Sequence, residues 1–98
     1  MSEPRSRREQ LGQELGNLRK LAGLSGRALA TRMSHLSQST ISRAEGGKAL
    51  LSRPEVDAWA NATGADPQRR AQLLSLLDAA VREEASWRGK LGERPPAG

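Results

Sequence analysis

The chain has to build its hydrophobic core almost without aromatic side chains. It contains no phenylalanine, no tyrosine and only two tryptophans in 98 residues. Strands are enriched in aromatic and β-branched residues, whereas leucine and alanine favour helices. A chain of this length forms a single domain with a modest core. We therefore predict one all-α domain.

Apolar residues at steps of three and four, together with capping residues, predict five helices. The first starts at Arg8 and ends at Gly23, and one apolar stripe runs along it: Leu11, Leu15, Leu18 and Leu21 or Ala22. Ser25 is placed to cap a second, short helix, whose inner residues are Leu29, Ala30 and Met33. Ser37 is placed to cap a third helix, which ends at Gly46 and Gly47.

The last two predicted helices also begin with capping signals. Ser52 and Glu55 form the capping-box pattern, and the helix that follows carries Val56, Trp59 and Ala60 on its inner face and ends at Gly64. Asp66 is placed to cap a fifth helix, over about residues 66–88, with a broad leucine face. The predicted domain thus spans residues 8–88, between a flexible arm at 1–7 and a disordered tail or linker at 89–98.

The composition argues against an enzyme or a metal site. Cysteine is absent and His35 is the single histidine, so the usual zinc ligand sets cannot be assembled. Glu83 and Glu84 are neighbours, about 100° apart on a helix, which does not suit a catalytic carboxylate pair. We expect no cofactor. Because the chain has neither a membrane-spanning apolar run nor a hydrophobic signal core, we also expect a cytoplasmic protein with no membrane partner.

The net charge of +5 is concentrated in the middle of the chain. Residues 25–53 carry five basic groups and one acid, a balance of +4, against +2 for residues 1–24 and −1 for residues 54–98. A local positive excess is what a surface that binds a polyanion requires. Ordinary solubilising charge would also explain an excess of this size.

The second and third helices are joined by only three or so residues, Ser34 to Leu36. Such a short link makes two short helices cross steeply, which is the geometry of a helix-turn-helix over residues 25–46. In the third helix, Ile41 and Ala44 are three apart and face the core, so the other side of the helix is left polar. In this geometry the second helix of the motif enters the DNA major groove.

Residues 10–67 resemble the helix-turn-helix domain of the phage-repressor-like regulators (Cro/C1, or XRE), especially the actinobacterial ones. The resemblance rests on the strings "LRKLAGLS", "ALA" at 28–30 and "SQSTISRAEGG". It implies a five-helix lambda-repressor-like fold and a bacterial, nucleoid-associated transcriptional regulator, expected to act as a homodimer on double-stranded DNA. The chain would be the N-terminal domain of a larger regulator with a C-terminal effector domain, or a short stand-alone form.

The resemblance also implies roles for single residues. Three match base-contacting positions: Gln38, Ser39 and Arg43. Five are implied as phosphate contacts or remain ambiguous: Arg27, Ser37, Thr40, Ser42 and Lys48. Arg19 and Glu45 match a structural salt bridge. Two positions depart from the family pattern: Gly26 replaces a glutamine that holds a DNA phosphate in many relatives, and the link "MSHLS" is one residue longer than usual.

These departures support an alternative hypothesis, in which the chain is a protein-interaction module of the antitoxin or co-regulator kind. Its fifth helix would then bind a small partner protein, and its DNA contacts would be vestigial. Four residues of that helix are candidates for a dimer or partner surface: Leu73, Leu77, Val81 and Trp87. The fifth helix could instead fold back to complete the core, which would account for part of its leucine face.

Overall fold

A computed structural model describes residues 6–34 and 36–92, with side chains described as far as residue 85. Within these residues the chain forms five helices and no strand. They are α1 (Arg7–Leu21), α2 (Gly26–Met33), α3 (Gln38–Glu45), α4 (Arg53–Thr63) and α5 (Pro67–Gly92). The predicted five-helix, all-α fold is confirmed.

The predicted capping residues start four of the five helices. In each case a side-chain oxygen accepts a hydrogen bond from the backbone N–H three residues later, at 2.7–3.3 Å; the four residues are Ser25, Ser37, Ser52 and Asp66. The box at the start of α4 is complete, because Glu55 also accepts a bond from the backbone N–H of Ser52. These bonds satisfy amide groups that a helix leaves without an internal partner.

Two helix ends differ from the prediction. α1 begins at Arg7, because Ser6 and Glu9 form a second capping box that the sequence analysis did not identify. α5 continues to Gly92, four residues past the predicted end at 88. Gly89 does not stop it, since one glycine weakens a helix without breaking it. Residues 1–5 and 93–98 of the predicted arm and tail lie outside the described residues.

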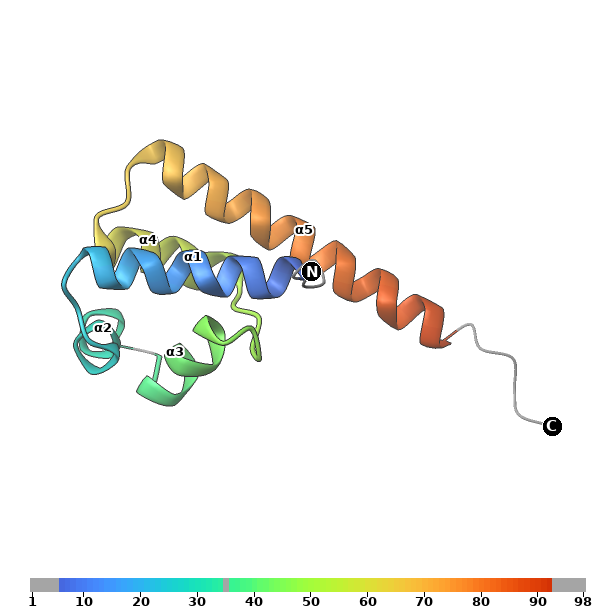
Figure 1. The fold of residues 1–98 in the computed structure, drawn as a ribbon, viewed down its shortest axis with the longest axis horizontal. Helices are drawn as coiled ribbons and strands as arrows, with labels where there is room; N and C mark the ends of the chain where they lie inside the picture. Colours follow the sequence, from blue (N-terminus) through green and yellow to red (C-terminus); the bar gives the residue numbers. More distant parts are fainter. Residues whose placement is uncertain (1–5, 35, 93–98) are drawn as a thin grey trace, which may run out of the picture.

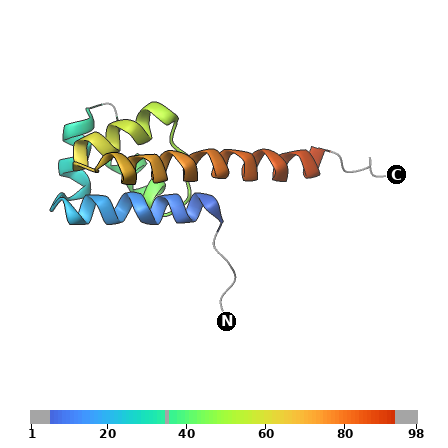
Figure 2. The same ribbon diagram turned by 90° about the horizontal axis from the view of Figure 1, so that it is seen from above.

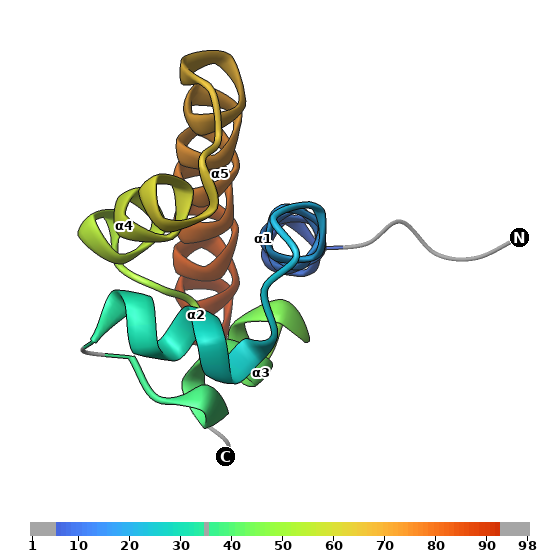
Figure 3. The same ribbon diagram turned by 90° about the vertical axis from the view of Figure 1, so that its left-hand side faces the viewer.

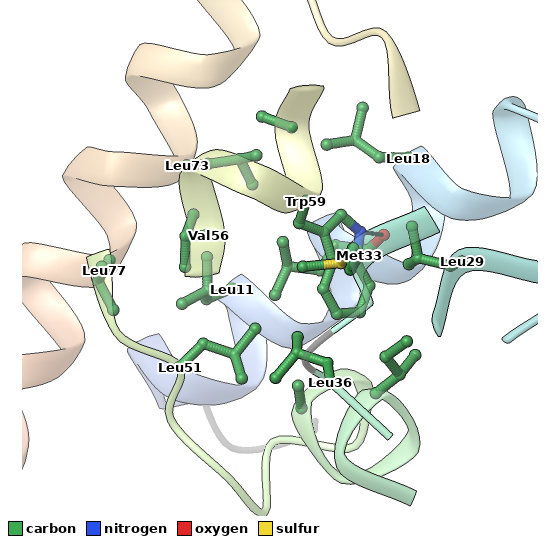
Figure 4. Packing of buried hydrophobic residues seen from close by; sticks show 14 residues of the cluster. Leu11, Leu18, Leu29, Met33, Leu36, Leu51, Val56, Trp59, Leu73 and Leu77 are labelled. Carbon is green, nitrogen blue, oxygen red and sulfur yellow. Dashed lines mark hydrogen bonds between the residues drawn. The ribbon is translucent and has the colours of Figure 1, made fainter. Parts of the chain in front are cut away.

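All five helices contribute to one hydrophobic core, with Trp59 near its centre (Figure 4). Trp59 is fully buried, as predicted, and its indole N–H donates to the backbone oxygen of Leu15 at 3.1 Å. The larger core side chains around it are those of Leu11, Leu15, Leu18, Leu29, Met33, Leu36, Ile41, Leu51, Val56, Leu73 and Leu77. A core this rich in leucine compensates for the missing phenylalanine and tyrosine.

The predicted dimer or partner surface on α5 is wrong for two of its four residues. Leu73 is only 1% exposed and Leu77 only 3%, because α5 packs against both α1 and α4. Val81 remains 49% exposed, and the side chain of Trp87 lies outside the described residues. The fold-back of the fifth helix therefore accounts for the inner part of its leucine face.

The predicted stripe of α1 also ends earlier than expected. Leu11, Leu15 and Leu18 are buried, but Leu21 is 78% exposed. The helix ends at this residue, so no further turn lies beside it, and Leu24 packs against the core after the chain has turned.

α2 and α3 lie together on one side of the molecule, below α1 and α4 in Figures 1 and 3. α5 is much longer than the others, and its last turns extend beyond the rest of the bundle (Figures 1 and 2). The arrangement leaves the outer side of α2 and α3 uncovered by any other described helix.

Candidate nucleic-acid interface

α3 has two distinct faces. Ile41 and Ala44 are buried, with 1% and 2% of their surface exposed, and Thr40 and Glu45 are half-buried beside them. The other four residues of the helix are all exposed: Gln38, Ser39, Ser42 and Arg43. At 100° per residue these four fall within one arc of about 140°. The structure therefore brings the predicted base-contacting residues together on a single uncovered face.

A close approach between α1 and α3 fixes the position of this face. A Cβ atom at Gly12 would lie 2.8 Å from the backbone oxygen of Glu45 and closer still to that of Ala44. Gly12 and Gly16 both lie on the side of α1 that meets α3. Side chains at these positions would hold the two helices further apart, so the glycines set how deeply α3 sits against the body.

The turn between α2 and α3 is held at both sides by the core. Met33 ends α2 and Leu36 precedes the cap of α3, and both side chains are buried. Ser34 adopts a left-handed conformation with φ 57°, unusual for a residue other than glycine, and its N–H donates to the backbone oxygen of Ala30. His35 lies outside the described residues. Two buried anchors thus constrain the lengthened link of the predicted motif.

Residues 10–73, about two thirds of the chain, match the sequence pattern of the helix-turn-helix domain. The matched segment contains α2, the turn, and α3 with its uncovered polar face. The chain belongs to the helix-turn-helix domain family. No match was found among curated proteins or among solved structures. Family membership supports DNA as a partner of the chain.

A partly buried ion pair links α1 to the end of α3. The Arg19 guanidinium donates through Nε and Nη2 to the two carboxylate oxygens of Glu45, at 2.5 and 2.9 Å, and through Nη1 to the backbone oxygen of Leu24 at 2.9 Å. The bond to Glu45 raises the pKa of Arg19 above its ordinary value. One side chain therefore links α1, the α1–α2 connection and the end of α3.

Basic side chains are used differently on the two sides of the molecule. Between α1, α4 and α5, four arginines form ion pairs with acids: Arg8 with Glu84, Arg53 with Asp78, Arg69 with Glu14, and Arg70 with Asp57. By contrast, the exposed side chains of Arg27, Arg43 and Lys48 have no ion-pair partner among the described residues. Their charge is therefore available to an external anion.

Of the other residues predicted for the interface, two take part in capping α3 and two have exposed side chains on or next to that helix. The Ser37 hydroxyl caps α3 and lies 3.0 Å from the Thr40 hydroxyl, so both take part in capping. Ser42 is exposed beside Gln38. Lys48 follows α3, and its backbone N–H donates to the backbone oxygen of Arg43, so its exposed side chain lies close to the end of that helix.

Two further basic side chains lie on this half of the domain and were not among the predicted interface residues, Arg32 and Lys20. Arg32 donates to the backbone oxygen of Ala62 at 3.1 Å and so links α2 to the end of α4. Lys20 lines an open hollow beside Gly46, between α1 and the end of α3. The bond of Arg32 is a tertiary contact that no local sequence pattern encodes.

In residues 6–34 and 36–92 no three histidine, cysteine or acidic residues are clustered as a metal ion would require. Among the described helices, none combines the length and apolar character needed to cross a bilayer.

Proposed function

We propose that this chain is a sequence-specific transcriptional regulator that binds double-stranded DNA by inserting α3 into the major groove. The observation that carries the proposal is the uncovered face of α3. Three exposed residues whose side chains can hydrogen-bond to bases lie together on this face: Gln38, Ser39 and Arg43. A helix about 10–12 Å across fits the major groove, which is about 12 Å wide. The resemblance to Cro/C1-type regulators supports the same docking.

The side chains suggest which bases are recognised. The Gln38 amide offers one donor and one acceptor group, which matches the N6 and N7 edge of adenine. The Arg43 guanidinium can donate two parallel hydrogen bonds to O6 and N7 of guanine. The shorter Ser39 hydroxyl, next to Gln38, can reach a base or a phosphate. We therefore expect a half-site with a preference for adenine at the Gln38 step and for guanine at the Arg43 step.

The cations that flank α3 suit the DNA backbone. Arg27 on α2 and Lys48 after α3 are exposed and unpaired among the described residues. Phosphate contacts of this kind orient a protein on the duplex without carrying sequence information. In this proposal Arg27 and Lys48 contact phosphates, and Ser42 makes a further polar contact beside Gln38.

A dimer on a two-fold operator is the expected working form. One recognition helix contacts only a few base pairs, which is too short a sequence for specificity in a genome, and paired half-sites solve this problem. The far end of α5, which extends beyond the bundle, is where we place the second subunit or a partner protein (Figure 2). Bound at a promoter, such a dimer would act sterically as a repressor.

The first test targets base recognition. Selection of bound sequences from a random DNA pool defines the site, after which affinities are measured for sites with single base changes. We expect Gln38→Ala and Arg43→Ala each to relax preference at one base step, at a cost of about 1–3 kcal/mol in binding. The reason is that each variant removes a side chain that can pair with a base edge.

Arg43→Lys is the matched control for the second variant. It keeps the positive charge but cannot form the two parallel hydrogen bonds, so it should retain much of the general affinity while losing the preference for guanine. If both alanine variants discriminated between bases as well as the parent protein does, α3 would not be the recognition helix. This result would favour the alternative hypothesis of a protein-interaction module.

A second test separates phosphate contacts from base contacts. Lys48→Ala should weaken binding to all sequences alike and reduce the slope of log affinity against log salt by about 0.9, because one phosphate contact is lost. Arg82→Ala is the control, since it removes an equal exposed charge from α5, which lies outside the helix-turn-helix of α2 and α3. Equal slopes for Lys48→Ala and the parent protein would contradict the assigned role.

A further inference from the structure

Gly26, the first residue of α2, lies directly beside Gln38, the first residue of α3. A Cβ atom built on Gly26 would lie 3.7 Å from Cγ and 4.0 Å from Nε2 of Gln38. Leaving aside the chain neighbours of Gly26 and the backbone of its own helix, the Gln38 side chain is what this Cβ would meet within 4 Å among the described residues. The first residues of α2 and α3 therefore lie next to each other, with only a small space between them.

The backbone of α2 does not require a glycine at this position. The described glycines with positive φ are Gly23, Gly47 and Gly64, so Gly26 has a conformation that any residue adopts. Ser25 already caps the helix through the N–H of Ala28. Alanine is the better helix former, so glycine here weakens α2 slightly. What glycine provides at this position is space.

We infer that Gly26 is a specificity-determining residue that acts through Gln38. The inference rests on the proposed function, in which Gln38 contacts a base. Glutamine has three rotatable side-chain bonds, and no α2 side chain at position 26 restricts them. The amide can then present its donor and acceptor groups in several orientations, so the protein tolerates more than one base at this step.

A methyl group at position 26 should narrow this tolerance. It would stand in van der Waals contact with Gln38 Cγ and exclude some side-chain rotamers without displacing the backbone. Holding one rotamer-rich side chain in place changes binding by about two- to tenfold. We therefore expect Gly26→Ala to sharpen base preference at the Gln38 step by about two- to tenfold, with preferences elsewhere in the site unchanged.

The experiment is a double-variant cycle on DNA recognition. Base preferences are measured at every step of the selected site for the parent protein, Gly26→Ala, Gln38→Ala and the variant that carries both changes. Gly46→Ala is the matched control, because its φ is also negative and its Cβ would meet Lys48 and backbone oxygens of α3 but not Gln38. Circular dichroism and the melting temperature establish that each variant is folded.

The inference is supported if Gly26→Ala sharpens preference at one step and this effect disappears when Gln38 is also alanine. It is overturned if Gly26→Ala leaves that preference unchanged, if the effect persists without Gln38, or if affinity changes equally for all sequences, as loss of a phosphate contact would cause. Failure of the proposed function looks different, since Gln38→Ala would then leave base preference unaltered.

Discussion

Trp59→Ala is expected to lower the free energy of unfolding by about 3–5 kcal/mol. Trp59 is the largest fully buried side chain, and its removal leaves a cavity where side chains from all five helices meet (Figure 4). The hydrogen bond from its indole N–H to Leu15 is lost as well. Because small domains are stable by only about 5–15 kcal/mol, a large part of the stability should disappear. Urea unfolding followed by circular dichroism measures the loss.

Trp59→Phe is the control for this prediction. Phenylalanine keeps most of the apolar volume, so it should lower the free energy of unfolding clearly less than alanine does. Because it cannot donate the hydrogen bond, a smaller loss should remain. A loss below about 1 kcal/mol for Trp59→Ala would contradict the central position of this side chain in the core.

Gly12→Ala is expected to destabilise the domain by about 1–3 kcal/mol and to weaken DNA binding beyond what the loss of folded protein explains. The added Cβ would overlap backbone oxygens at the end of α3 and not the tip of a flexible side chain, so the two helices have to separate. This shift moves the face that carries Gln38 and Arg43. Unfolding curves and DNA affinity, measured on the same preparation, test both parts.

Gly16→Ala is the matched control, one turn further along α1. Its Cβ would meet the side chain of Glu45 at 3.4 Å, which can adjust, and the gain in helix propensity of about 1 kcal/mol offsets part of the cost. We expect a near-neutral change in stability and little change in affinity. If Gly12→Ala proved as mild as Gly16→Ala, the close approach of α1 and α3 would not determine the position of α3.

The periodicity of α3 was sufficient to predict which of its residues face away from the core, whereas their base-contacting roles came from the resemblance to similar regulators. Ile41 and Ala44 repeat at helical spacing, so the sequence also predicted that Gln38, Ser39 and Arg43 would lie on the other side. The structure exposes these three residues together.

The proximity of Gly26 and Gln38 could not be predicted from the sequence. The sequence showed only that Gly26 departs from the pattern of similar regulators. Its contact with the position of Gln38 depends on how α2 and α3 cross, which is set by Met33, Leu36 and Ile41 in the core. The sequence alone predicted a lost phosphate contact at this position, whereas the structure points to the freedom of a neighbouring side chain.

The sequence by itself determined the helices, four of their caps and the polar face of α3, because these depend on interactions between residues three or four apart. Tertiary structure alone decided which apolar residues are covered. Leu73 and Leu77 became core residues since α1 and α4 lie against α5, whereas Leu21 on the predicted stripe stayed exposed at the end of its helix. Burial depends on a partner that is distant in the chain, and local periodicity does not specify that partner.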